Sequence, residues 1–246
     1  MATTLNASSS SNGLIASGDA SGNLALQGNG TTGLTIDLNG KINVPNIALG
    51  TAVAGMMEYD GKVPYFTPSG TQRGVMPGMQ YYRLNADLVG ANVATVQNIL
   101  GVGVTLSSNT VYEFNALFIL TKTLGTTAHT IGIGFGGTST INNILYQELG
   151  SNYAGGLSGG NTNSSVSQIT INSTSNQTII PSTSTASVFA WIRIFGTVSI
   201  NAGGTFIPQY TLSAAPGGAY STTAGSYFKI YPIGASGSNI SVGTWA

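Results

Sequence analysis

The chain has 246 residues, and only 6% of them are charged, with seven basic and seven acidic side chains that cancel. About a quarter of an average soluble protein is charged, and a protein that neutralises phosphates needs a basic surface, so the composition argues against a nucleic-acid partner. No apolar run approaches the ~20 residues that cross a bilayer, so we expect no membrane partner. Cysteine is absent, which excludes disulfides and thiolate metal sites.

The first region, residues 1–45, begins with a Ser-rich end that lacks both the basic residues and the apolar segment of a secretory signal. Short apolar runs follow, at 22–27, 33–38 and 39–44, and Gly-Asn or Asn-Gly pairs that favour tight turns separate them. Strands this short cannot bury a core alone. The pattern predicts either an extended stalk, in which several copies wrap around one axis, or a disordered linker.

The second region, residues 46–78, carries a hairpin signal. Asp60-Gly61 stands between the runs Met56–Tyr59 and Val63–Phe66, and Pro64 marks the second arm as an edge strand. We interpret this region as a connector between the extended first region and the C-terminal part of the chain.

The third region, residues 79–246, shows longer alternating runs with Gly, Ser and Asn at the joins, which predicts an all-β antiparallel sandwich or jelly roll. The expected strands are 79–84, 98–106, 111–121, 129–136, 141–149, 166–172, 177–181, 187–200, 204–214, 226–234 and 240–245. A long loop is expected over 150–165. The only helical candidate is 85–100, and Gly90 within it weakens that prediction.

Three of these strands are apolar on both faces. In 110–121, Tyr112, Phe114 and Phe118 are expected to fill the core, whereas Leu117 and Ile119 need cover from a second sheet or a neighbouring subunit. The strands 187–200 and 226–234 likewise carry apolar residues on both faces. The predicted subunit interface therefore comprises Leu117, Ile119, Phe189, Trp191, Arg193, Phe195, Tyr227 and Tyr231. Arg193 is expected to stack on Trp191 or to pair with Glu113 or Glu148, either within one subunit or between subunits.

Two stretches carry a resemblance to known families. The run 23–44, followed by the "GMMEYDGKVPYFTPSGTQRGV" of 55–75, resembles the connector segments of bacteriophage fibre proteins. The strands "TVYEFNALFIL" (110–120), "SVFAWIRIFGTVSI" (187–200) and "AGSYFKIYPIG" (224–234) resemble the trimeric jelly rolls of the tumour-necrosis-factor and complement-head type. The resemblance implies a homotrimeric fibre, spike or decoration on a virus particle. Its N-terminal region would attach to capsid or tail proteins, and its head would be exposed.

The residues offer little for catalysis. His129 is the only histidine, and Glu58 and Asp60, the closest acids in sequence, fall at a predicted turn, where structural roles are expected. We therefore predict no catalytic, metal or cofactor site and no enzyme activity. Two alternatives stay open: a head that binds a host-surface glycan through Tyr153 and Tyr220, or a polysaccharide-degrading enzyme that uses Glu58, Glu113 or Glu148.

Overall fold

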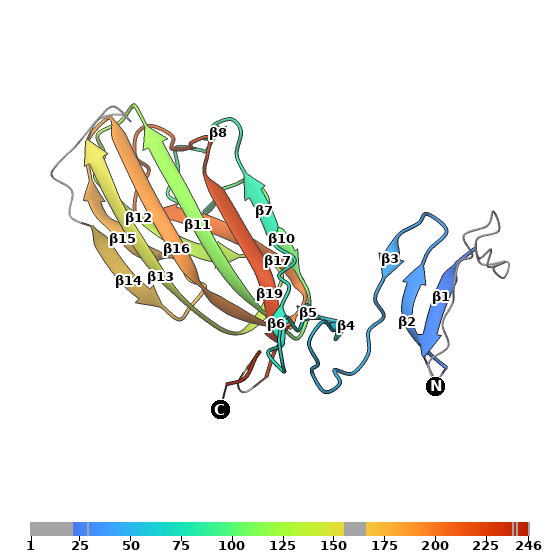
Figure 1. Cartoon of the computed structure of the whole chain (residues 1–246). Helices are drawn as coiled ribbons and strands as arrows, with labels where there is room; N and C mark the ends of the chain where they lie inside the picture. The colour runs from blue at the N-terminus through green and yellow to red at the C-terminus, as the bar shows by residue number, and fades with distance from the viewer. Residues whose placement is uncertain (1–21, 29, 155–165, 238, 240, 246) are drawn as a thin grey trace.

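The structure, a computed structural model, describes residues 22–28, 30–154, 166–237, 239 and 241–245. All regular structure in these ranges is strand, as predicted, and Figure 1 shows its arrangement. No helix in the described ranges is long and apolar enough to cross a membrane. The N-terminal strands are β1 (Leu24–Gly28), β2 (Thr31–Ile36) and β3 (Ile42–Asn43), and the connector strands are β4 (Met57–Tyr59), β5 (Pro64–Phe66) and β6 (Gly74–Val75).

The head is a sandwich of two antiparallel sheets, between which the chain crosses repeatedly. Its strands are β7 (Gln80–Arg83), β8 (Leu88–Val89), β9 (Gln97–Asn98), β10 (Val104–Leu106), β11 (Thr110–Lys122), β12 (His129–Gly136), β13 (Thr140–Ala154), β14 (Ser167–Ile171), β15 (Gln177–Thr183), β16 (Val188–Ala202), β17 (Gly204–Leu212), β18 (Ser221–Thr222) and β19 (Tyr227–Ala235). The larger, eight-stranded sheet runs β14-β13-β16-β11, and β18 and β19 both pair with the far edge of β11. The smaller sheet runs β10-β17-β12-β15, with β9 also on β17.

The central strand β11 organises the larger sheet. It pairs with β16 without a bulge, from Thr110 opposite Ile200 to Lys122 opposite Val188. Side chains alternate between the two faces of a strand, so every second residue of β11 points at the smaller sheet. Phe114 and Phe118 are buried on that inner side, as predicted, while Leu117 and Ile119 point to the other side.

Aromatic rings from both sheets meet at the centre of the core. The rings of Phe135 and Phe206, in the smaller sheet, stack at 4.4 Å between centroids, and the ring of Phe114, in the larger sheet, lies 5.3 Å from that of Phe135. Tyr146 and Phe228 complete the cluster. Such contacts stabilise beyond the area they bury and fix the distance between the two sheets.

The segment 85–100, the weak helical candidate, forms no helix, in keeping with the all-β prediction. Leu88 and Val89 instead pair with β18 as the short strand β8. At Gly90 an added Cβ would lie 2.4 Å from the Tyr210 hydroxyl and 3.0 Å from the Tyr220 carbonyl oxygen, so this backbone packs tightly against the sandwich. The apolar spacing thus serves two short strands and a packed loop.

The connector hairpin forms as predicted, but the expected edge position of its second arm is wrong. β5 lies between β4 and β6, and the Pro64 carbonyl oxygen accepts from the Met76 amide at 2.8 Å. Gly61 has φ +83°, which Asp60-Gly61 turns require, and Asp60 Oδ1 accepts hydrogen bonds from the backbone of Lys62 and Val63, both 2.8 Å. The Lys62 ammonium then donates to the Ser108 carbonyl at 2.8 Å, which ties the connector to the head.

Two expectations near the chain's later loops are wrong. Residues 241–245 form no strand. Instead, Ser241 to Gly243 share a cleft with Leu49 and Arg73 of the connector, so the chain does return to the base of the head. β13 continues through Ala154, so the first part of the expected 150–165 loop is strand, and the rest lies outside the described residues.

Candidate functional site

All eight residues of the predicted interface lie on one surface, the outer face of the larger sheet, which points away from the smaller sheet. The register places them in rows: Leu117 is opposite Arg193 and Tyr227, Ile119 is opposite Trp191, and Asn115 is opposite Phe195. Phe189 and Tyr231 extend the same face. Sequence alternation on three separate strands therefore identified a single surface.

No described part of the chain covers this outer face. Leu117, Ile119, Trp191 and Tyr227 are half-buried by their neighbours, and Phe195 is 38% exposed. The smaller sheet packs only on the inner side, which eliminates the second sheet as their cover among the described residues. A neighbouring subunit stays as the predicted cover.

Arg193 stands in the middle of this apolar face. Its partner across the sheet on each side is a leucine, Leu117 on β11 and Leu149 on β13. Pairing with Glu148 is wrong, because Glu148 points into the core from the opposite face of β13. Glu113 shares the outer face but lies four residues along β11 from Leu117, about 13 Å, and no ion pair joins it to Arg193.

The N-terminal sheet presents a second uncovered apolar surface. Its strands pair Leu24 with Ile36, Leu26 with Leu34, and Ile36 with Ile42, and directly paired residues share a face. We call these five side chains the stalk face. The face contains no polar side chain, and Leu24, Leu26 and Ile42 are 41%, 45% and 69% exposed.

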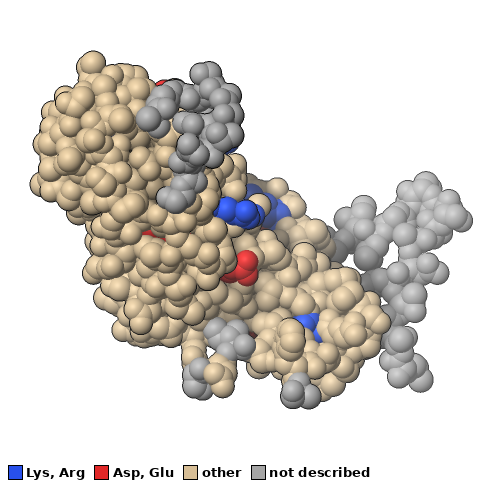
Figure 2. All heavy atoms as spheres, turned by 90° about the vertical axis from the view of Figure 1, so that its left-hand side faces the viewer, with Lys and Arg blue, Asp and Glu red and all other residues tan. Residues whose placement is uncertain are grey.

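Few charges occur on the visible surface, and Figure 2 shows one side of the molecule almost free of Lys, Arg, Asp and Glu. In the described ranges no three His, Asp or Glu side chains gather in a way that could hold a metal ion. The acids proposed for a hydrolase are dispersed. Glu58 forms an ion pair with Arg73 at 2.7 Å and accepts from the Gly50 amide at 3.0 Å, so it stabilises the connector.

Glu148 is the most unusual titratable group in the head. It is completely buried, and neither carboxylate oxygen has a hydrogen-bond partner. Burial raises the pKa of its carboxyl to about 9, so Glu148 is protonated at neutral pH. The Tyr146 hydroxyl on the same strand is also buried without a partner, and burial and then the nearby Glu148 raise the pKa of that tyrosine. Among the described residues no second carboxyl pairs with Glu148, as glycoside hydrolysis would require.

His129 has the structural role that its sequence context predicted. Its Nδ1 lies 2.7 Å from the Thr127 carbonyl oxygen and must donate, which leaves Nε2 to accept from the Tyr220 hydroxyl at 2.8 Å. Burial, and the nearby Lys122 ammonium, lower the pKa of His129 despite the opposing effect of the Thr127 hydrogen bond. The imidazole is therefore held neutral within the core.

Lys122 closes the pole of the head that lies farthest from the connector. Its ammonium is buried and donates to the carbonyl oxygens of Leu124, Gly125, Thr185 and Ala186, at 2.5 to 3.4 Å. Burial lowers the pKa of this amine. The ammonium therefore links two separate turns, one at Leu124 and Gly125 and the other at Thr185 and Ala186.

The residues expected to bind a glycan are not together. Tyr220 is completely buried beneath His129 and cannot reach an external ligand, so that assignment is wrong. Tyr153 lies near the end of β13, half-buried, with its ring 6.1 Å from that of Phe189 on the outer face.

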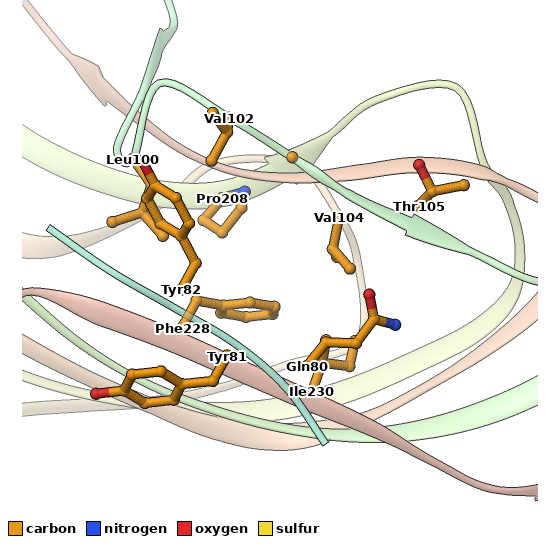
Figure 3. A pocket seen from close by; sticks show the side chains of 11 residues that line it. Gln80, Tyr81, Tyr82, Leu100, Val102, Val104, Thr105, Pro208, Phe228 and Ile230 are labelled. Atoms are coloured by element: carbon orange, nitrogen blue, oxygen red, sulfur yellow. The ribbon is translucent and has the colours of Figure 1, made fainter. Parts of the chain in front are cut away.

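A pocket that sequence reasoning missed opens where the two sheets part. It has a volume of about 330 Å³ and lies between β7 of the larger sheet and the 100–105 segment that leads into β10 of the smaller one. Figure 3 shows Tyr82, Leu100 and Pro208 at one end, and Gln80 and Thr105 at the other. No local motif marks it, because its walls come from segments more than 100 residues apart in the sequence.

The chain was also compared with known proteins. No protein-family model, no curated protein and no solved structure matches it.

Proposed function

We propose that the protein is a structural component of a virus particle, a bacteriophage fibre, spike or decoration that assembles as a homotrimer. The N-terminal region attaches to other capsid or tail proteins, and the head is exposed on the particle. The observation that carries this proposal is the stalk face, a sheet surface made only of Leu and Ile side chains that no described segment covers. The virion location and the number three rest on the resemblance of 23–44 and 55–75 to phage fibre connectors.

The N-terminal sheet is too small to bury its own apolar face. Its three strands have five, six and two residues, and no second layer among the described residues covers its apolar side chains. Identical sheets arranged around a symmetry axis would bury these side chains against each other, and closed symmetry prevents open-ended aggregation. The outer face of the head supplies a second surface for the same assembly.

The proposal carries no catalytic step. Glu58 and Asp60 are engaged in the connector, and Glu148 is buried away from any substrate. Recognition of a surface glycan is a second candidate function. Tyr220 is buried and cannot contribute to glycan binding, but the pocket between the sheets favours this function.

Light scattering on the purified full chain tests the assembly. We expect about 75 kDa, three times the 25.0 kDa of one chain. Leu34→Glu places a charge on the stalk face and should dissociate the assembly, at least in its N-terminal part. Thr35→Glu, the next residue on the opposite face of β2, should not. A wild-type mass of 25 kDa would refute self-assembly.

The absence of cysteine allows a clean test of the outer face. Leu117→Cys treated with a short bismaleimide should give cross-linked species on a denaturing gel. Leu124→Cys, at an exposed position in the turn after β11, should stay monomeric on the gel. Equal cross-linking of both variants would remove the outer face from the interface. Immunogold labelling of particles purified from producing cells then tests the virion location, and unlabelled particles would count against it.

A further inference from the structure

The pocket at the open side of the sandwich is built on the hydrophobic core. Its floor consists of Phe228 and Ile230, which are 4% and 1% exposed and also pack inside the head. Tyr82 pairs with Phe228 across the sheet, so both rings face the same side, and the Tyr82 ring is still 44% exposed. A flat aromatic surface therefore stands open beside a fixed apolar floor (Figure 3).

Polar groups without hydrogen-bond partners border the pocket. The Gln80 amide is exposed and makes no hydrogen bond within the described chain. The Tyr82 hydroxyl is equally free. An amide offers both donors and acceptors, and hydroxyls offer both as well, so these groups suit a ligand that carries hydroxyl groups. The Thr105 side chain lies on the other face of its strand, because Thr105 alternates with the core-facing Val104 and Leu106.

No charged residue lines the pocket. The nearest cations on the same strands, Arg83 and Lys229, belong to the outer face, because they alternate with the pocket residues Tyr82, Phe228 and Ile230. An ionic ligand would lose its hydration here without gaining a counter-charge. A pure hydrocarbon would leave the Gln80 amide unpaired.

We propose that this pocket binds a neutral pyranose sugar. The Tyr82 ring packs against the C–H face of the sugar, and the Gln80 amide hydrogen-bonds its hydroxyl groups. Pockets of this size, mostly apolar with a few placed polar groups, are typical of small-ligand sites. The inference does not depend on trimer assembly, since every lining residue comes from one chain, and it deepens only the second candidate function above.

Saturation-transfer NMR on the full chain tests the proposal with three probes: methyl β-D-glucopyranoside, methyl β-D-galactopyranoside and N-acetylglucosamine. At least one probe should receive saturation, strongest at the ring protons of one sugar face. Tyr82→Ala should weaken its binding about tenfold, since it removes the stacking surface. Tyr82→Phe keeps the ring and should bind within about threefold of wild type. It therefore controls for loss of binding through misfolding.

The chain offers a matched control in the adjacent residue. Tyr81 is similarly exposed and also borders the pocket, but its side chain points away from it (Figure 3). On the outer face the Tyr81 ring stacks on Tyr227 at 5.5 Å. Tyr81→Ala should leave sugar binding unchanged, and Gln80→Ala should weaken it. The proposal fails if no sugar receives saturation, or if Tyr81→Ala and Tyr82→Ala behave alike. Binding of N-acetylphenylalanine amide without any sugar would also overturn it and would assign the pocket to an apolar side chain of a protein partner.

Discussion

The head and the N-terminal sheet are built by the same rules and differ in what covers them. Both are antiparallel, and both place apolar residues at every second position of their strands. In the head, Phe114 and Phe118 meet a second sheet from the same chain, and they are almost fully buried. In the N-terminal sheet, Leu26 and Leu34 lie opposite each other, but no second layer of the described chain covers them. Period-two patterning therefore identifies a strand but does not identify the layer that will bury it.

The largest effect is expected in the head core. Phe114→Ala removes a fully buried ring that contacts four other aromatic rings, and it should lower the free energy of unfolding by about 3–5 kcal/mol. Urea unfolding followed by tyrosine and tryptophan fluorescence measures the loss. Leu117→Ala, on the outer face of the same strand, should cost the isolated head about 1 kcal/mol or less. Similar losses for both variants would erase the difference between the inner and the outer face.

The next effect depends on pH. The pKa of Glu148 is about 9 in the folded chain and near 4.5 when unfolded, so the unfolded state releases its proton first as the pH rises. Stability should therefore fall steadily between about pH 4.5 and 9, and at pH 7 the cost is about 3 kcal/mol. Glu148→Gln, which cannot ionise, should remove this slope.

Urea midpoints measured from pH 4 to 9 for the wild type and Glu148→Gln give the difference directly. His129 titrates in both proteins and cancels in the comparison. Parallel pH profiles would mean that water reaches the Glu148 carboxyl. The head core would then be less well covered than the comparison with the N-terminal sheet assumes.

The smallest effect concerns one hydrogen bond. Tyr220→Phe removes the hydroxyl that donates to His129 Nε2 and leaves a buried acceptor unpaired, so it should cost about 1–2 kcal/mol in urea unfolding. Tyr227→Phe removes a hydroxyl that bonds Asn115 at 3.4 Å on the half-exposed outer face, and it should cost less than about 0.5 kcal/mol. If the two variants lose equal stability, burial is not what distinguishes these hydrogen bonds.

The sequence predicted the long strands well because their patterns are long. β12 matches the expected 129–136, and β11 differs from the expected strand by one residue at each end. β8 and β18 were missed, since two residues carry no detectable period. Between β18 and β19 the ladder beside β11 is interrupted, and there the Ser226 hydroxyl accepts from the Ile119 amide at 3.0 Å.

The predicted site residues follow the same rule: the face of a residue in a long strand was predicted correctly, and the position of Tyr220, in a short segment, was not. Alternation gathered Leu117, Trp191 and Tyr227 on one surface because each lies in a long strand. Tyr220 was misplaced, since it lies between Gly218 and Ser221 in a segment without periodicity. Its burial comes from long-range packing against Gly90 and His129, which no local pattern shows. The pocket depends on pairing between β7 and β19, a contact across almost 150 residues that no local pattern encodes.

The return of residues 241–243 to the connector decides how the molecule can be engineered. Entry and exit of the head chain share one pole (Figure 1), so a peptide added after Trp245 would emerge beside the connector. The opposite pole carries the turn at Leu124 and Gly125, whose ends the Lys122 ammonium clamps. A loop grafted there would be displayed outward on a rigid base, which makes that turn the natural insertion point for an antigen or an affinity tag.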